Sequence, residues 1–335
     1  MQIYDFRFED GIGAGIPDES SVCNLESEIC NALLMSIRQI TIIGNGLIGG
    51  SLGLALKQRK FSGRIIGCDR APVLERAHEK GAIDAAVSNP ADAVQGSSVV
   101  VLATPVVAII DLIERLGPAL SAKALLTDVG STKSEVVARA QKVFGKAASQ
   151  RFLAGHPMAG KEQSGVEFAD ADLFQGAAWF VTPLPGQDID SGLSGEFLEW
   201  VEKMGARIAN VGPKEHDQLC AWISHLPQMI STALAASLVD EFGDAPLLEA
   251  GGRALREMTR ISSSPYSMWR DIAITNKKNI ADALLKLEQR LAHIRENLDS
   301  RELAAEFERA HELRKEKVAK AISPQRHRGT EKSKT

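Results

Sequence analysis

The chain has 335 residues, of which 44% are hydrophobic and 24% are charged, with a formal net charge of −4. This length exceeds the usual size of one domain, so we expect two main domains of about 150 residues each. The weakly acidic balance gives no electrostatic reason to expect a nucleic-acid partner. The four cysteines form no C-x-x-C pair and have no histidine at zinc spacing. They indicate a reducing, cytoplasmic location without disulfides and without a bound metal.

The two ends of the chain differ from the rest in composition. Residues 1–35 hold seven acidic residues against one arginine and lack the basic start and apolar run of a signal peptide. Met35 stands directly before the first clear strand, so the preceding residues are interpreted either as an acidic, disordered extension or as the product of a misplaced start codon. No function is assigned to them. Residues 321–335 form a basic tail that is low in apolar residues and is expected to be disordered too.

A glycine-rich segment lies between a predicted strand and a predicted helix. The β-branched run Ile40 to Ile43 precedes Gly44-x-Gly46-x-x-Gly49, and a helix-forming segment follows. This order is the one that the dinucleotide-binding fingerprint requires. A tight turn at Gly44, close approach of a pyrophosphate at Gly46, and packing of helix on strand at Gly49 explain the glycines. The helix N-terminus favours the anionic phosphates. The predicted contacts with NAD in this segment are Gly44, Gly46, Leu47, Ile48 and Gly49.

The next predicted strand, GRIIGCD, ends at Asp69, twenty residues after Gly49. An acidic side chain at this distance typically binds the adenosine ribose hydroxyls, which favours NAD over NADP. Arg70 keeps NADP open, because its guanidinium could accommodate a 2′-phosphate. A solvated aspartate at the end of a strand is the simpler alternative.

Further strands are predicted in SSVVVLATP and ALLTDVGS, separated by the helical segment VAIIDLIERL. This alternation predicts an α/β fold with a Rossmann-type parallel sheet over residues 36–185. Ligands bind beyond the carboxyl ends of such strands, so Thr104 and Pro105 are expected beside the nicotinamide. The same two residues interrupt the most apolar run, Ser97 to Ile113, which is too short to predict a membrane span.

Two polar motifs follow the next strands of the predicted sheet. DVGSTK places Ser131 at the end of one strand, where it is a candidate for catalysis or, more simply, for capping the next helix. AGHPMAG places His156 among glycines on the same rim. A lone histidine is usually structural, but glycines here would permit the close approach of a ligand. His156 is therefore a candidate acid or base.

From about residue 190 the strand pattern stops, and residues 190–320 are predicted to form a helical substrate and dimerisation domain. Pro227 should kink or divide the first long apolar helix. Leucines and isoleucines at successive steps of 4, 3, 4, 3 and 4 from Ile280 to Leu298 form a heptad-like stripe. Such a stripe suits internal bundle packing or a homodimer.

Six motifs occur in order between about Arg38 and about Leu298: GNGLIGGS, LATP, DVGSTK, GHPMAGKEQSG, EHDQLCAWISHLP and REMTRISSSPYSMWRDI. In this order they resemble the prephenate/arogenate (cyclohexadienyl) dehydrogenase family of tyrosine biosynthesis. The resemblance implies an oxidative decarboxylation without a metal. A hydride leaves the hydroxyl-bearing ring carbon for NAD, and loss of CO2 aromatises the ring to give 4-hydroxyphenylpyruvate or tyrosine. It also implies a C-terminal, all-helical dimerisation domain.

The resemblance assigns roles to three residues. His156 would accept the ring hydroxyl proton, a task that suits an imidazole. Ser131 would hydrogen-bond the same hydroxyl and hold the histidine in place. Arg260 would grip the ring carboxylate through a two-point contact. From the residues alone, Arg260 would instead be a solvated charge on a helix face.

Further substrate contacts implied by the resemblance are less specific. Glu162 and His225 match family positions near the substrate, although His225 could be a core histidine. Trp269 matches a tryptophan that reaches a neighbouring subunit's active site, whereas the residues alone suggest a core aromatic. Gln228 stands where a second histidine is common, so recognition of the substrate side chain would differ.

Two other functions fit parts of the sequence. A β-hydroxyacid dehydrogenase or imine reductase would need a catalytic lysine in the helical half, where Lys277 and Lys278 are the candidates. A non-catalytic NAD-sensing dimer would bind the cofactor without turnover and would have no use for Ser131, His156 and Arg260 together. The sequence leaves open whether the substrate is prephenate or arogenate, and whether tyrosine inhibits.

Overall fold

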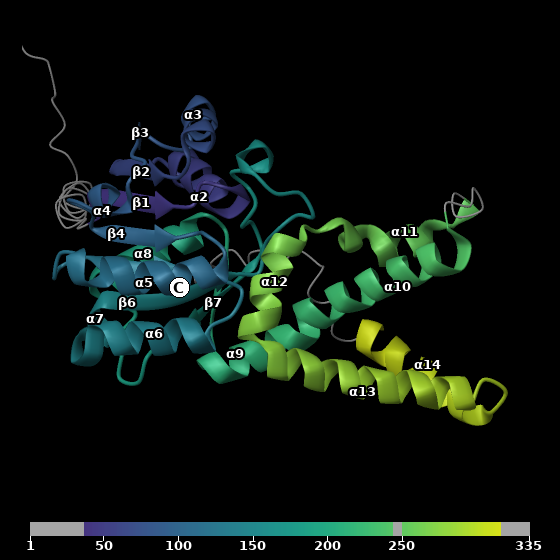
Figure 1. The fold of residues 1–335 in the computed structure, drawn as a ribbon. Coiled ribbons are helices and arrows are strands. Elements are labelled where there is room, and N and C mark those ends of the chain that lie inside the picture. Colours follow the sequence, from purple (N-terminus) through teal and green to yellow (C-terminus); the bar gives the residue numbers. More distant parts are fainter. Residues whose placement is uncertain (1–36, 244–249, 316–335) are drawn as a thin grey trace, which may run out of the picture. The chain divides into compact units, whose positions relative to one another are not determined.

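The computed structural model describes residues 37–243 and 250–315 (Figure 1). The expectations for residues 1–35 and for the basic tail 321–335 lie outside the described residues. None of the helices in the described ranges is long and apolar enough to cross a membrane.

An eight-stranded sheet forms the first part of the described chain, in the order β3-β2-β1-β4-β5-β6-β7-β8. The strands are β1 Gln39–Ile43, β2 Arg64–Cys68, β3 Ala85–Ala86, β4 Val99–Leu102, β5 Leu125–Asp128, β6 Phe152–Pro157, β7 Ala178–Thr182 and β8 Arg207–Asn210. The chain runs outward from β1 to β3 and then returns to place β4 on the other side of β1. The strand order therefore reverses between β1 and β4, which is where α/β sheets of this kind bind ligands.

Helices cover both faces of this sheet because its strands are apolar on both sides. The helices of this part are α2 Leu47–Gln58, α3 Ala71–Glu79, α4 Pro90–Ala93, α5 Val106–Leu116, α6 Ser134–Phe144, α7 Ala148–Arg151 and α8 Gly192–Lys203. On one face, Val100 and Leu102 of β4 share a buried cluster with Ile109 of α5 and Val136 of α6. Figure 1 shows α5 and α6 side by side over this face, with α8 behind the sheet.

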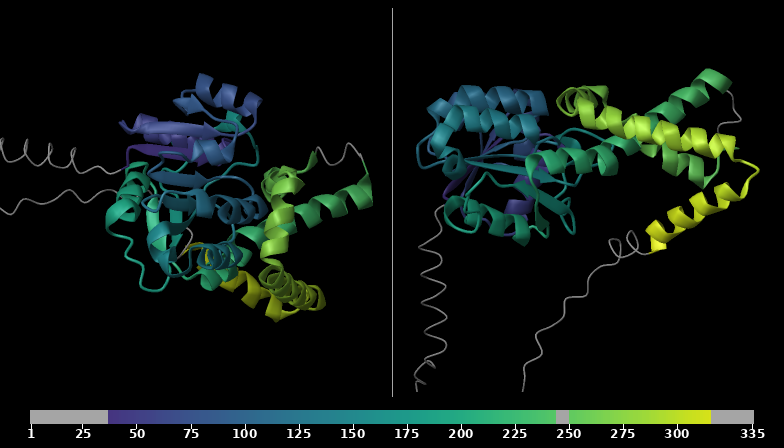
Figure 2. Two further views of the ribbon diagram at one scale, coloured as in Figure 1. Left: turned by 60° about the vertical axis from the view of Figure 1, so that its left-hand side comes forward. Right: turned by 90° about the horizontal axis from the view of Figure 1, so that it is seen from below.

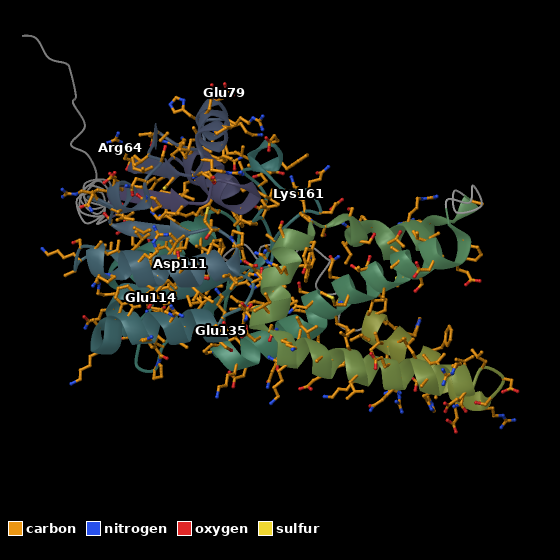
Figure 3. All side chains as sticks on the ribbon, viewed as in Figure 1. Arg64, Glu79, Asp111, Glu114, Glu135 and Lys161 are labelled. Carbon is orange, nitrogen blue, oxygen red and sulfur yellow. The ribbon has the colours of Figure 1, made fainter. Side chains whose placement is uncertain are left out.

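Charged side chains lie on the outer surface of the same helices. Asp111 and Glu114 of α5 and Glu135 of α6 are exposed, as Figure 3 shows. These helices thus pair an apolar stripe toward the sheet with a polar face toward solvent.

The predicted parallel Rossmann-type sheet is confirmed, with two differences in detail. Strand β7 runs antiparallel to β6, and β8 then pairs in parallel with β7. The expectation that strands stop at about residue 190 is wrong, because β8 and its preceding helix α8 extend the sheet domain to Asn210. The signal in β8 was weak, since only four residues pair and none of them is fully buried.

The described residues after β8, 211–243 and 250–315, are mostly helical, as predicted. Its helices are α9 Pro213–Cys220, α10 Leu226–Phe242, α11 Arg253–Thr259, α12 Tyr266–Thr275, α13 Lys277–Glu296 and α14 Arg301–Leu313. A π-helical turn, Ala221–His225, separates α9 from α10, and Pro227 lies in the first turn of α10. The backbone stays right-handed helical through His225 and Leu226, so the change that accompanies the proline is a change of helix type. The proline is tolerated there because the first-turn N–H groups of a helix need no partner within it.

The helical part buries little of its apolar surface within one chain. Its small core holds Ala221, Ile272 and Ile280. By contrast, Leu291 and Leu298 of the predicted stripe are 55% and 65% exposed, and Phe307 of α14 is 71% exposed. Two further views of these helices are given in Figure 2. An apolar face left open in this way is typical of a protein–protein interface.

Candidate active site

A cavity of about 620 Å³ lies at the carboxyl ends of the strands and is closed on the other side by the helical half. It gathers most of the site residues predicted from the sequence. From the sheet domain these are Gly46, Leu47, Ile48, Thr104, Pro105, Ser131, His156 and Glu162. From the helical half they are Gln228, Arg260 and Trp269. Of the remaining predicted residues, Gly44, Gly49, Asp69, Arg70 and His225 do not line it.

The three glycines of the fingerprint meet three different demands. Gly44 has φ +96°, and a Cβ there would lie 2.6 Å from the backbone carbonyl of Ala103. At Gly49 a Cβ would lie 1.9 Å from the carbonyl oxygen of Gly44, so only glycine lets α2 pack on the loop. At Gly46 a Cβ would meet nothing within 4 Å and would project beside the cavity. The loop therefore has the tight turn, the close packing and the open approach that a dinucleotide requires.

Asp69 stands beside this glycine-rich loop at the end of β2. Its Oδ2 accepts a hydrogen bond from the backbone N–H of Asn45 at 2.7 Å, and its Oδ1 accepts one from the N–H of Arg70. The carboxylate is thereby fixed at the edge of the glycine-rich loop. The Arg70 side chain is exposed and precedes α3.

Thr104 follows β4 across the reversal point from the loop. Its Oγ1 is buried and has no hydrogen-bond partner among the described residues. A polar atom in this position, beside the cavity, can serve a ligand that supplies a partner.

His156 is the fifth residue of β6 and is 7% exposed. Burial first, and then the nearby His216, Lys133 and His225, hold the pKa of His156 well below its ordinary value. The imidazole is therefore neutral near pH 7 and able to accept a proton. Its Nδ1 lies 2.9 Å from Nε2 of His216.

A buried ion pair braces the strand just before this histidine. Lys133 and Asp128 pair with both side chains fully buried, and Lys133 Nζ also donates to the carbonyl oxygen of Gly155 at 2.7 Å. Asp128 accepts a hydrogen bond from the backbone N–H of Gly130 at 2.8 Å. The contacts tie the end of β5 to β6 and fix the backbone that carries His156.

Ser131 lines the same cavity as His156. The alternative that it caps the following helix is wrong, because α6 begins at Ser134 with Lys133 at its N-cap. Asp217 of α9 caps α6 instead, accepting hydrogen bonds from the backbone N–H groups of Lys133 and Ser134 at 2.7 Å and 2.9 Å. The Ser131 hydroxyl is thus left for the cavity.

The helical half contributes three of the predicted residues to the cavity. Arg260 Nη1 lies 3.0 Å from Glu162 Oε2, and the arginine side chain is 59% exposed. Gln228 is buried, and its Nε2 donates to the carbonyl oxygen of Ile261 at 2.9 Å and to Thr232 Oγ1 at 3.1 Å. Trp269 of α12 packs against the small helical core, as the residues alone suggested, and it also lines this chain's own cavity. Its implied position in a neighbouring subunit's site stays a prediction.

His225 does not line the cavity, and its suggested contact with the substrate stays a prediction. It is fully buried behind Trp269, with the two rings edge to face at 6.0 Å. Its Nδ1 pairs with Nδ2 of Asn276 at 3.2 Å, while its buried Nε2 has no partner among the described residues. Burial lowers the pKa of His225 to about 4. Its placement supports the alternative of a core histidine.

The motif EHD contains His216 and Asp217, two site residues whose position beside His156 was not predicted from the sequence. His216 and Asp217 are buried next to His156, and Cys220 lies one helical turn later on the same face of α9. The nitrogen and sulfur atoms of His156, His216 and Cys220 lie within 4.8 Å of one another, as in a metal site. However, the 2.9 Å between the two ring nitrogens is a hydrogen-bond distance and is shorter than two tetrahedral zinc ligands allow.

Family models for prephenate dehydrogenase match most of the chain. The nucleotide-binding domain matches residues 52–210 and the dimerization domain matches residues 212–312. Prephenate dehydrogenase of Bacillus subtilis is 36% identical over 248 residues, which are 72% of this chain and 65% of that protein. The chain thus spans about two thirds of the length of this relative.

Solved structures agree in fold. The structure of A. aeolicus prephenate dehydrogenase with hydroxyphenyl propionate and NAD+ has a TM-score of 0.73 at 30% identity, covering 86% of this chain and 98% of that one. Synechocystis arogenate dehydrogenase has a TM-score of 0.66 at 28% identity, covering 85% and 100%. The fold and the glycine-rich loop define a protein with a nucleotide-binding sheet domain and a helical second domain. Within that class, the chain belongs to the prephenate dehydrogenase family.

Proposed function

We propose that this protein catalyses the NAD-dependent oxidative decarboxylation of prephenate, arogenate or both, as part of tyrosine biosynthesis. The observation that carries the proposal is the meeting of Ser131, His156 and Arg260 in one cavity with the open edge of the Gly46 loop. These residues come from the loop after β5, from β6 and from the helical half, far apart in sequence. NAD would supply the hydride acceptor. The products would be 4-hydroxyphenylpyruvate from prephenate and tyrosine from arogenate.

The protein's own residues would bind and orient the substrate and move one proton. His156, neutral because it is buried, accepts the ring hydroxyl proton. Ser131 hydrogen-bonds that hydroxyl, and Arg260 binds the ring carboxylate. Glu162 and Trp269 complete the wall around the substrate. Gly44, Gly46, Leu47, Ile48, Gly49, Asp69, Arg70, Thr104 and Pro105 would hold the cofactor, with Asp69 on the ribose.

Gln228 favours arogenate as a substrate. Both hydrogens of its Nε2 are used by Ile261 and Thr232, and the Ile261 carbonyl oxygen can only accept, which fixes the orientation of the amide. Its Oε1 is therefore the atom left to face the cavity. A carbonyl oxygen accepts a hydrogen bond from the ammonium group of arogenate but not from the keto group of prephenate.

The protein would act as a homodimer in a reducing, cytoplasmic compartment. The apolar face of α13 and α14 is exposed, with Leu291 at 55% and Phe307 at 71%. This exposure supports a dimer in which a second copy of the chain packs on that face. The dimerization-domain match over residues 212–312 supports the same assembly. The two described cysteines, Cys68 and Cys220, are free thiols, as a reducing compartment requires.

The other two functions have less support. Lys277 and Lys278, the lysine candidates for a reductase, are exposed at the start of α13 and do not line the cavity. A non-catalytic NAD sensor would leave the convergence of Ser131, His156 and Arg260 without a purpose.

The test is NADH formation, followed by absorbance, with purified protein, NAD, and prephenate or arogenate in parallel. We expect turnover, with the higher kcat/KM for arogenate. His156→Asn should lower kcat by about 10²-fold or more while NAD still binds, as measured by protein fluorescence quenching or calorimetry. No turnover with either substrate, with NAD or NADP, would refute the proposed reaction. Near-normal turnover by the variant would refute the role of His156.

A further inference from the structure

A continuous chain of hydrogen bonds runs from His156 into the helical half. His156 Nδ1 lies 2.9 Å from His216 Nε2, and His216 Nδ1 lies 2.9 Å from Asp217 Oδ1. Asp217 accepts two further hydrogen bonds, from the backbone N–H groups of Lys133 and Ser134. His216 and Asp217 are 0% and 1% exposed. Because solvent is excluded, these partners decide where the protons of the two imidazoles lie.

The positions of the protons follow from the Asp217 end of this chain. Burial raises the pKa of Asp217, but hydrogen bonds from His216, Ser134 and Lys133 outweigh it and leave the pKa below its ordinary value. An ionised carboxylate only accepts hydrogen bonds, so His216 must carry its hydrogen on Nδ1. Burial lowers the pKa of His216, so this ring is neutral and its Nε2 can only accept. His156 must then donate from Nδ1.

Cys220 does not change this order. Its Sγ lies 3.4 Å from His216 Nε2 and 3.9 Å from His156 Nδ1. Burial and the nearby Asp217 raise the pKa of Cys220 to about 12, so it is a thiol. A thiol can donate weakly to His216 Nε2 or accept weakly from His156 Nδ1. Both contacts agree with His216 Nε2 as an acceptor.

We propose that His216 and Asp217 are positioning residues that hold His156 in its Nδ1–H tautomer, so that its unprotonated Nε2 faces the cavity. This inference rests on the proposed function of the site. In the reaction, the substrate O–H bond breaks and a bond from its proton to Nε2 of His156 forms. The adjacent C–H bond also breaks, and its hydrogen and electron pair pass as hydride to NAD, so that the carbinol carbon becomes a carbonyl carbon. The resulting imidazolium stays bonded through Nδ1–H to His216, which is oriented by the Asp217 carboxylate, as in other histidine–carboxylate arrangements.

The same residues also have a structural role, so a loss of activity alone would not test the proposal. Asp217 caps α6, and the His216 ring packs edge to face on Phe180 at 5.4 Å. A suitable variant must therefore keep the ring packing or the acceptor. His216→Phe keeps a ring on Phe180 but removes the acceptor. His216→Gln loses the ring but offers an amide oxygen to His156 Nδ1–H. The exposed His78 provides a matched control as His78→Gln.

The direct measurement is the tautomer of His156, read from long-range ¹H–¹⁵N correlation spectra of the full protein labelled at histidine. The His156 signals are assigned by their loss in His156→Asn. In the wild type and in His78→Gln we expect a neutral His156 protonated on Nδ1. In His216→Phe the Nδ1–H form should no longer dominate, whereas His216→Gln should retain it. A wild-type His156 protonated on Nε2 would overturn the proposal, whether or not any variant folds.

Kinetics give a second, independent readout. We expect His216→Phe to lower kcat by about 10²-fold or more with the KM for NAD unchanged, and His216→Gln to lie within about tenfold of the wild type. Equal kcat values for the two variants, together with an unchanged His156 tautomer, would show that His216 is merely structural. The spectra need no substrate. A wild type inactive on both substrates but showing the Nδ1–H tautomer would therefore refute the proposed function and not the positioning.

Discussion

Arg260 and Glu162 form an ion pair although 98 residues separate them in the sequence, and both line the same cavity. The pair joins the loop after β6 to the helical half. Glu162 engages only Nη1 of the Arg260 guanidinium, and 59% of the arginine side chain is exposed, so Arg260 still has N–H groups to offer a carboxylate.

We therefore expect Arg260→Ala to raise the substrate KM by about 10- to 100-fold, the usual effect of losing charged hydrogen bonds, with a smaller change in kcat. Steady-state kinetics at saturating NAD would measure both. The matched control is Arg253→Ala, since Arg253 is 87% exposed on α11 and does not line the cavity. Similar KM values for the two variants would show that Arg260 does not bind the substrate.

Two glycines of the same loop should respond differently to the same substitution. Gly49→Ala would place a Cβ 1.9 Å from the Gly44 carbonyl oxygen, so we expect a lower melting temperature. Gly46→Ala has open space for its Cβ and should melt near the wild-type temperature. Because that space would hold the cofactor, the affinity of the Gly46→Ala variant for NAD should fall about tenfold or more. Calorimetry on both variants would decide, and unimpaired NAD binding by Gly46→Ala would contradict the placement of the pyrophosphate.

Asp69 should set the choice between the two nicotinamide cofactors. The Asn45 N–H fixes the Asp69 carboxylate beside the glycine-rich loop. In this position the carboxylate would accept hydrogen bonds from the ribose hydroxyls and repel a 2′-phosphate. We expect Asp69→Ser to raise the KM for NAD about tenfold and to improve the use of NADP, helped by Arg70. Ratios of kcat/KM for the two cofactors give the measurement. An unaltered ratio would place the ribose elsewhere.

Acid should destabilise the protein partly through His225. The pKa of this buried imidazole is about 4, against 6.5 for an ordinary histidine, so only the unfolded chain takes up a proton between these values. The free energy of unfolding is therefore unaffected by this group above about pH 6.5. It decreases as the pH falls toward about 4, by at most about 3 kcal/mol, and the loss then levels off.

His225→Asn keeps an acceptor for the Asn276 amide but cannot titrate. Urea unfolding between about pH 7 and about pH 4 should show a shallower loss of stability for this variant than for the wild type. The difference between the two curves removes the contributions of carboxylates and of His156, which both proteins share. Parallel curves would mean that His225 takes up a proton as readily in the folded protein as in the unfolded chain.

Local patterns were enough to predict the sheet domain. The β-branched run before Gly44, the spacing to Asp69 and the residues after each strand place ligand-binding side chains at one edge, because parallel strands end on the same side. The last strand, β8, was missed since its four residues are neither strongly apolar nor fully buried. The antiparallel direction of β7 depends on its pairing with β6, which no local sequence pattern encodes.

The contacts between the two parts of the chain could not be predicted in the same way. Cys220 lies one helical turn after His216, so their common face could be predicted, but nothing local says that this face meets His156. Asp217 caps α6, a helix that begins 83 residues earlier, and takes the capping role that was one of the two alternatives for Ser131. His225, expected near the substrate, is instead buried behind Trp269. Such pairings are decided by tertiary packing alone.

The π-helical turn Ala221–His225 sets the helical phase between two parts of the site. An α-helix advances about 100° per residue, and a π turn adds one residue to its circuit. His216 before the turn can thus point at the imidazole on β6 while Gln228 after it lines the cavity. Removing one residue from the turn would rotate all of α10 by about 100° against α9. Gln228 would then no longer line the cavity while His216 contacts His156.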